Sequence, residues 1–312
     1  MAPMEVVRDL DAARAWGRPR AVAVGFFDGV HLGHQELLSR LTRTAAGLGG
    51  VSAVLTFDPH PLALVRPGAA PALLTSIPQK AAIMEKLGVD HLMVLPFVEQ
   101  LRELDPLAFV RQVLVEGLET SAVLVGFNFT FGYRGQGNAS VLSRLAAPYG
   151  ISVEVVPPVR AGGTVVSSTE IRRSLLEGQV ERARELLGRP HRLCGTVVRG
   201  SGRGRSLGYP TCNLMVDDRV LVPAGGVYAV MVELPGGART GGVCNVGNRP
   251  TFGGQDTTIE VHIIERDGDW YGQLLCVDLM GRLRSERAFA SSAALSRQIS
   301  RDIQRVLRLR ME

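Results

Sequence analysis

The chain has 312 residues, of which 46% are hydrophobic, and it carries a formal net charge of +5 with a sequence pI of about 9.3. This length is enough for two domains with separate cores, and no apolar run approaches the roughly 20 residues that span a bilayer. The first residues also lack a signal-peptide core. We therefore expect no membrane partner. Binding of anionic nucleotides would be a sufficient reason for the mild excess of basic residues.

The four cysteines, Cys194, Cys212, Cys244 and Cys276, lie far apart and form no C-x-x-C pair. This spacing predicts scattered reduced thiols, not a zinc site or a disulfide framework. Reduced thiols in turn predict a cytoplasmic protein.

The first half of the chain alternates two kinds of segment. Apolar runs predict strands at 21–24, 51–57, 91–95, 121–125 and 151–156, and helical stretches such as 79–87 and 106–116 lie between them. This alternation predicts a Rossmann-like α/β domain, with a parallel sheet and helices on both faces. Two short helices follow between 168 and 187, and Gly188-Arg189-Pro190 predicts a boundary that closes a first domain at 1–187.

The second half lacks this alternation. Apolar runs at 193–198, 227–234, 240–246, 257–264 and 273–279 are separated by glycine-rich turns. Closely spaced strands without helices predict a small antiparallel β-barrel domain over 188–312.

The chain closes with an amphipathic helix. One stripe of it is apolar, and the other is basic, with Arg297, Arg301, Arg305 and Arg308. We interpret the basic stripe as a solvated face. Nucleic-acid binding by this stripe is the alternative, and we expect no nucleic-acid partner.

The most informative motif follows the strand at 21–24, where His31 and His34 flank Gly33 at the start of a predicted helix. A helix N-terminus offers free N–H groups and a positive dipole end, which suit a phosphate. The glycine lets a phosphate approach the backbone, and two imidazoles can stabilise charge that develops on a phosphoryl group. This is the His-x-Gly-His arrangement of nucleotidyltransferases. A glycine-rich turn with incidental histidines is the alternative, and the chain contains neither G-x-G-x-x-G nor a P-loop sequence.

Three further segments of the first half have two readings each. The stiff turn at Pro59-His60-Pro61 either forms an apolar wall of a site for a flat ring or is a plain turn that ends a strand. Asn128, among alternating aromatic residues, either contacts a ring or belongs to a strand with one face in the core. Ser167 and Glu170 have capping-box spacing, and the same helix start could present Arg172 to phosphates.

The second half contains a glycine- and arginine-rich loop, residues 200–208, followed by Thr211 and Asn213. Two residues apart on a strand, Thr211 and Asn213 face the same side and could hold Mg²⁺ through oxygen. Alone, such a loop could also be a solvated turn or an RNA-binding segment. Glu260, in an apolar strand, is a candidate general base for a substrate hydroxyl; an exposed position on an edge strand is the alternative.

Taken together, these motifs resemble the prokaryotic bifunctional riboflavin kinase/FAD synthetase family over essentially the whole chain. The matching segments are 25–34, 167–172, 207–213 and 245–252, together with Glu260-Val261-His262. The resemblance implies that a C-terminal barrel phosphorylates riboflavin to FMN with ATP and Mg²⁺. It also implies that the N-terminal domain transfers AMP from a second ATP to FMN, giving FAD and pyrophosphate.

The resemblance also implies roles for individual residues, with Glu260, His31 and His34 as catalytic groups. In the first domain it implies ATP contacts by Gly25, Phe27, Asp28, His31, Gly33, His34, Ser168, Thr169 and Arg172. It implies FMN contacts there by Pro59, His60, Pro61 and Asn128. In the barrel it implies ATP contacts by Gly202, Gly204, Arg205, Gly208, Pro210, Thr211 and Asn213, with Thr211 and Asn213 as the Mg²⁺ ligands and Arg284 at the flavin.

Departures from the family pattern are few: Phe127 stands beside Asn128 at a usually polar place, Cys212 lies between the metal ligands, and Ser285 replaces a frequently acidic residue. Two other functions remain possible from the sequence. One is a riboflavin kinase whose first half binds nucleotide without turnover. The other is a non-enzymatic flavin- or RNA-binding regulator.

Overall fold

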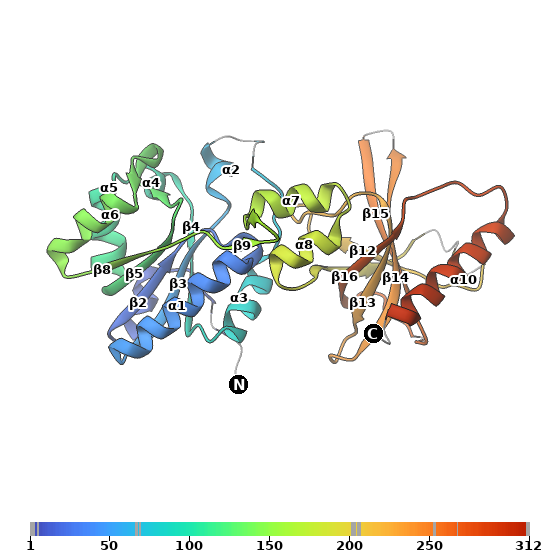
Figure 1. Cartoon of the computed structure of the whole chain (residues 1–312), viewed down its shortest axis with the longest axis horizontal. Coiled ribbons are helices and arrows are strands. Elements are labelled where there is room, and N and C mark those ends of the chain that lie inside the picture. The colour runs from blue at the N-terminus through green and yellow to red at the C-terminus, as the bar shows by residue number, and fades with distance from the viewer. Residues whose placement is uncertain are drawn as a thin grey trace. The chain divides into compact units, whose positions relative to one another are not determined.

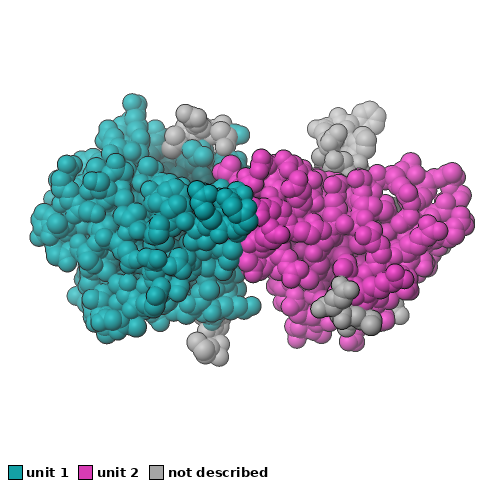
Figure 2. Space-filling model, viewed as in Figure 1, with its two compact units in different colours: residues 1–167 teal, residues 168–312 magenta. Residues whose placement is uncertain are grey.

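The computed structural model describes residues 4, 6–65, 68, 70–200, 204, 207–251, 254–266 and 268–309. The chain divides into two compact units, residues 1–167 and residues 168–312 (Figure 2). Each unit has its own sheet and its own core, and each is described by itself.

The first unit is built on a six-stranded sheet in which every neighbouring pair is parallel. The order across the sheet is β1 (Val6–Val7), β4 (His91–Pro96), β3 (Val51–Asp58), β2 (Arg20–Val24), β5 (Thr120–Gly126) and β8 (Ser152–Val156). This confirms the predicted parallel α/β domain, and the nearly continuous burial of the central strands is typical of a sheet covered on both faces.

Two apolar cores lie on the two faces of this sheet, whose strands and flanking helices are shown in Figure 1. Successive residues of a strand point to opposite faces, so Ala21 and Ala23 of β2 contact one core while Val22 and Val24 contact the other. The first core includes α1 (Leu32–Leu48) and α3 (Ile77–Lys86). The second includes η1 (Leu10–Ala15), α5 (Pro106–Phe109), the π-helix η3 (Val110–Gly117) and α6 (Ala139–Ala146).

Short elements complete the first unit. They are η2 (Asp28–Val30), α2 (Pro61–Val65), α4 (Glu99–Arg102), β6 (Thr130–Phe131), η4 (Tyr133–Gly135), β7 (Gly137–Asn138), η5 (Ala147–Tyr149), β9 (Arg160–Ala161) and β10 (Thr164–Val165). Of these, η2 matters most for the site, because it connects the end of β2 to the first turn of α1.

The second unit is a closed antiparallel barrel, as the sequence predicts. The order around it is β11 (His191–Val198), β12 (Cys212–Val216), β15 (Gly254–Ile263), β14 (Arg239–Thr251), β13 (Gly226–Glu233) and β16 (Leu274–Arg284). The C-terminal helix α10 (Ser292–Leu309) packs against β13 and β14, where Val306 contacts the cluster that includes Val227 and Val243.

Two helices, α7 (Ser168–Leu176) and α8 (Val180–Leu187), belong to the second unit. Glu181 of α8 accepts a hydrogen bond from the backbone N–H of Arg282 at 2.8 Å, and Leu175 O of α7 accepts one from Ala224 N at 3.0 Å. The compact unit therefore begins at Ser168, and the domain boundary after Leu187 stays a prediction.

Cys194 and Cys276 form a disulfide, so the prediction of four reduced thiols is wrong for this pair. The antiparallel pairing of β11 with β16 places the two residues directly opposite each other, with their Cα atoms 4.1 Å apart. Because 82 residues separate them in sequence, their spacing gave no sign of this register. Cys212 and Cys244 are free, and burial raises the pKa of the Cys244 thiol to about 12.

We expect reduction of this disulfide to destabilise the barrel. A crosslink that closes a long loop restricts the unfolded chain and stabilises the folded state by about 2–4 kcal/mol, so a reductant should lower the unfolding temperature by about 5–10 °C. Differential scanning calorimetry with and without dithiothreitol measures this. The variant Cys194→Ala/Cys276→Ala should lose the response to reductant, whereas Cys212→Ala should retain it. The expectation would be contradicted if the wild-type protein, once a thiol assay shows that the disulfide is reduced, unfolds at an unchanged temperature.

We also expect a fragment of residues 168–312 to unfold at a higher temperature than one of residues 184–312. The shorter fragment loses the Glu181 and Leu175 hydrogen bonds and the buried side chains of Ile171, Leu175 and Val180, and each large apolar group removed from a core destabilises by a few kcal/mol. Circular dichroism melts of the two purified fragments provide the comparison. Equal unfolding temperatures would mean that α7 and the first half of α8 do not stabilise the barrel.

Candidate functional site

The N-terminus of α1 holds the two histidines of the first motif together. His31 is the N-cap residue, and its Nδ1 accepts a hydrogen bond from His34 N at 3.3 Å. The two imidazole rings are stacked, with centroids 3.6 Å apart and planes 13° apart, and the Phe27 ring lies edge-on to His34 at 5.2 Å. Two ring nitrogen donors and the free N–H groups of a helix start therefore lie in one place, which suits an anion.

Gly33 lies close to the His31 ring. A Cβ atom at this position would lie 3.2 Å from Cε1 and 3.3 Å from Nδ1 of His31. Such contacts are tighter than ordinary van der Waals distances, so a side chain would press on the ring that caps the helix. The spacing His-x-Gly-His thus has a structural basis in addition to the access it gives to the backbone.

The turn that leads into α1 is held by a buried carboxylate. Asp28 is 3% exposed, and it accepts hydrogen bonds from Leu74 N at 2.9 Å and from Thr75 N at 3.2 Å. These bonds support a turn in which Phe27 and Val30 have φ angles of 52° and 38°. Positive φ angles are unfavourable for residues other than glycine. Asp28 thus braces the loop, and its predicted contact with ATP stays a prediction.

Lys80 of α3 is a residue of this site that the sequence analysis missed. Its side chain is buried, and its Nζ donates to Phe26 O at 2.8 Å and lies 3.9 Å from the centre of the Phe26 ring. The Phe26 ring in turn meets the His60 ring edge-on at 4.2 Å. A lysine inside an amphipathic helix usually faces water, so only the packing of α3 beneath the turn identifies this one.

The carboxyl edge of the parallel sheet gathers the other predicted residues of the first unit. Gly25 follows β2, the turn at 59–61 follows β3, and Asn128 follows β5, and these three strands are neighbours in the sheet. Ligands of open α/β sheets bind at this edge. Phe127 is 50% exposed beside Asn128, which leaves an aromatic face open to a flat ligand.

Ser168, Thr169 and Arg172 lie in the first turns of α7, which belongs to the second unit. A helix start with two hydroxyl side chains can bind an anion. Their contact with the same ATP as His31 stays a prediction.

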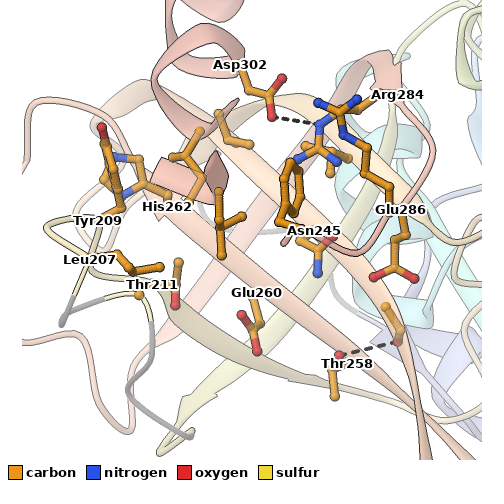
Figure 3. Close-up of a pocket in the computed structure, with 18 residues that line it drawn as sticks. Leu207, Tyr209, Thr211, Asn245, Thr258, Glu260, His262, Arg284, Glu286 and Asp302 are labelled. Atoms are coloured by element: carbon orange, nitrogen blue, oxygen red, sulfur yellow. Dashed lines mark hydrogen bonds and ion pairs between the residues drawn. The ribbon is translucent and has the colours of Figure 1, made fainter. Parts of the chain in front are cut away.

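The second unit contains a cavity of about 350 Å³ between α10 and the face formed by β14 and β15 (Figure 3). Its apolar wall includes Leu207, Val227, Val243, Phe289, Leu295 and Ile299. Its polar groups include Thr211, Asn245, Thr258, Glu260, His262, Arg284, Glu286 and Asp302. An apolar wall facing a few polar groups is typical of a small-molecule site.

The strand register brings the chemistry-bearing side chains of this cavity together. Glu260 of β15 lies opposite Asn213 of β12 on one side and Asn245 of β14 on the other. Figure 3 shows the Glu260 carboxylate and the Thr211 hydroxyl in the same part of the cavity, with Arg284 and Asp302 in another part of it. The predicted base and a predicted metal ligand therefore line one pocket.

A second cavity, of about 580 Å³, also reaches Thr211. Residues that the sequence analysis did not single out line it, namely Arg199, Arg266, Trp270 and Tyr271. The Arg199 guanidinium lies 5.9 Å from the centre of the Tyr271 ring. Cationic and aromatic side chains in one cavity suit an anionic ligand that carries a flat ring, and Thr211 lies where the two cavities meet.

The residues around Thr211 and Asn213 fit a hard metal ion bound with phosphate. Their side chains offer a hydroxyl and an amide oxygen, which Mg²⁺ accepts as ligands. A Cβ atom at Gly204 would collide with Tyr209 O and lie 3.0 Å from Thr211 Oγ1, and one at Gly200 would collide with the Asn213 amide. Gly200 and Gly204 thus lie too close to these groups to carry a side chain, while the predicted contacts Gly202 and Arg205 lie outside the described residues.

His262 anchors the segment that carries Thr211. Its Nδ1 donates to Pro210 O at 2.8 Å, and the Tyr209 ring meets the imidazole edge-on at 5.7 Å. Gly208, before this segment, has a φ angle of +83°, a conformation that glycine adopts without strain. The sequence motif Glu260-Val261-His262 thus combines a candidate base with a support for the neighbouring loop.

Comparisons with known proteins find relatives of both halves of the chain. A family model described as FAD synthetase matches residues 14–170, and one described as riboflavin kinase matches residues 187–309. The bifunctional riboflavin kinase/FMN adenylyltransferase of Pseudomonas fluorescens is 38% identical over 96% of each chain. The protein of the same description from Bacillus subtilis is 36% identical over 92% of this chain and 91% of its own.

A solved structure also shares this fold. It is titled a macrolide-efflux protein from Streptococcus pneumoniae, and it matches with a TM-score of 0.86 and 31% identity over 96% of this chain and 97% of its own. In the part of this chain that the structure describes, no helix combines the length and apolar character needed to cross a membrane. On the two family models and the full-length relatives, the chain belongs to the family of bifunctional riboflavin kinase/FMN adenylyltransferases.

Proposed function

We propose that this chain makes FMN from riboflavin and ATP, and then FAD and pyrophosphate from FMN and a second ATP. The observation that carries the proposal is the position of Thr211 between two cavities, one lined by the Glu260 carboxylate and the other by cationic and aromatic side chains. Riboflavin would occupy the first cavity and the nucleotide of Mg-ATP the second, so that the phosphoryl group passes between them at Thr211.

In the kinase reaction, Glu260 accepts the proton of the terminal ribityl hydroxyl as its oxygen attacks the γ-phosphorus of ATP. The bond between the γ-phosphorus and the bridging oxygen breaks, and ADP leaves with that oxygen. Thr211 and Asn213 would hold Mg²⁺, which would neutralise phosphate charge. Gly204 lies close to the Thr211 side chain and Gly200 lies close to the Asn213 amide, and Arg284 contacts the flavin.

In the adenylyl transfer, a phosphate oxygen of FMN attacks the α-phosphorus of ATP, and pyrophosphate leaves. His31, His34 and the N-terminus of α1 stabilise the charge that develops on the phosphoryl oxygens. Pro59, His60, Pro61 and Asn128 line the FMN side, and Ser168, Thr169 and Arg172 assist at the ATP phosphates. We propose that the predicted domains, 1–187 and 188–312, divide the two reactions between them.

The decisive experiment incubates the protein with riboflavin, ATP and Mg²⁺ and separates the flavins by chromatography. Both FMN and FAD should form, and EDTA should stop both reactions. If FMN forms without FAD, the protein is a kinase whose first half has no adenylyl-transfer activity. If neither FMN nor FAD forms, the proposal is refuted. A cytoplasmic location and the absence of nucleic-acid partners stay predictions, although the disulfide removes the reduced-cysteine argument for the former.

Replacement of the stacked histidines should abolish FAD formation and spare FMN formation. His31→Asn is the sharper variant, because asparagine can still cap α1 while the imidazole is lost; His34→Ala removes the second ring. Loss of one such donor lowers the rate of charge-developing steps by about 10²–10³-fold. The measurement is the initial rate of FAD formation from supplied FMN.

His91→Ala is the matched control for the histidine variants, because His91 stacks on Trp16 at 4.4 Å and not at this helix start. It should keep both activities. If both His31→Asn and His34→Ala form FAD at the wild-type rate, the two histidines have a structural role only.

Glu260→Gln should lower FMN formation by about 10²–10⁴-fold, because it keeps the shape of the side chain and removes the base. FAD formation from supplied FMN should be unaffected. The assay is the rate of riboflavin phosphorylation at saturating substrates. Glu233→Gln, which alters a carboxylate paired with Arg192 at 3.0 Å, serves as the control, and an unchanged kinase rate in Glu260→Gln would exclude the base role.

A further inference from the structure

We propose that Asp302, on the C-terminal helix, is a positioning residue that holds Arg284 in the orientation in which it binds riboflavin. This inference rests on the proposed function, because it names a determinant of the same cavity. Asp302 has no part in the sequence motifs, and it reaches the site only through the packing of α10.

Asp302 is a buried carboxylate whose oxygen atoms are both engaged. Its side chain is 1% exposed. Oδ2 accepts a hydrogen bond from Arg284 Nε at 2.9 Å (Figure 3), and Oδ1 accepts one from Gln298 Nε2 at 2.9 Å. A carboxylate so far from water is strongly unfavourable unless it is paired and hydrogen-bonded, so Asp302 and Arg284 have to be considered as one unit.

Arg284 is the last residue of β16, and the chain beyond it has no regular structure until α10 begins at Ser292. A long arginine side chain at such a strand end has many rotamers. The bond from Nε to Asp302 sets the plane of the guanidinium, and the Phe289 ring, 5.6 Å away, lies beside it. Arg284 is thereby kept in the cavity lining, with a side chain that is 19% exposed.

The composition of the cavity explains why a fixed guanidinium is useful there. Leu295 and Ile299 of α10 and Phe289 supply an apolar wall, and Asn245 supplies an amide. Riboflavin has a flat ring system with carbonyl oxygens along one edge, and a planar guanidinium can donate N–H groups to such acceptors in a defined direction. Asp302 takes up Nε, and Ser285 O accepts a hydrogen bond from Nη1 at 3.3 Å. The N–H groups of Nη2 are the ones that this arrangement directs to the ligand.

Stability alone does not account for this pair. A buried ion pair contributes about as much as an apolar pair of similar volume, and often less. The pair should therefore matter chiefly for binding. This distinguishes a positioning role from a structural one, because an apolar replacement can restore folding but cannot donate hydrogen bonds to a flavin.

The test measures riboflavin binding by quenching of its fluorescence, alongside KM and kcat of the kinase reaction in the full-length protein. Asp302→Asn should weaken binding and raise KM for riboflavin by about 10- to 100-fold, with kcat changed by less than about threefold. Arg284→Gln should have a similar effect. The double variant Asp302→Asn/Arg284→Gln should bind no more weakly than the worse single variant, since both changes remove one interaction.

The apolar pair Asp302→Leu/Arg284→Met separates the two roles. Its unfolding temperature should match that of the wild type, while its affinity for riboflavin should stay as low as that of Arg284→Gln. This arm also keeps the proposal testable if Asp302→Asn does not fold. Asp217→Asn, at an exposed carboxylate paired with Arg219, should leave all values unchanged.

Three results would overturn the inference: wild-type riboflavin affinity in Asp302→Asn, additive losses in the double variant, or wild-type affinity in the apolar pair. Failure of the proposed function has a different signature, because the wild-type protein itself would then neither bind riboflavin nor phosphorylate it.

Discussion

One row of side chains across β12, β15 and β14, formed by Asn213, Glu260 and Asn245, is the constraint on which the kinase site depends. In antiparallel strands a shift of one residue turns every side chain to the opposite face. A slip of β15 would replace Glu260 in this row by its apolar neighbours Ile259 or Val261. The closed barrel, with its other strands paired on both sides, is what prevents that slip.

In the first unit, a turn and not a strand register holds the site residues in position. Phe27 and Val30 adopt left-handed conformations on either side of Gly29, and such residues persist only where the surroundings hold them. The Asp28 carboxylate bonded to the backbone at Leu74 and Thr75, and the Lys80 amine bonded to Phe26 O, provide that support. The histidines therefore depend on two buried charged side chains that touch other parts of the chain.

The sequence predicts the features that are local and misses those that are not. The histidine helix start, the parallel sheet of the first unit and the antiparallel barrel of the second are predicted from local sequence patterns, and the structure agrees with them. The Cys194–Cys276 disulfide, the cavity with Trp270 and the burial of Lys80 each depend on segments far apart in sequence. Periodicity reports which face of an element is apolar, but it does not report which distant element meets that face.

The C-terminal helix illustrates this limit within one element. Its basic stripe is exposed as predicted, and even Arg305 keeps its solvent exposure while donating to Leu283 O at 2.9 Å. Its apolar stripe, however, has two different roles along its length. Ile303 and Val306 pack on the barrel, whereas Leu295 and Ile299 line the cavity. Because Asp302 lies between these two parts, the same packing that buries the end of the helix also brings a carboxylate to Arg284 and links the fold of α10 to the binding site.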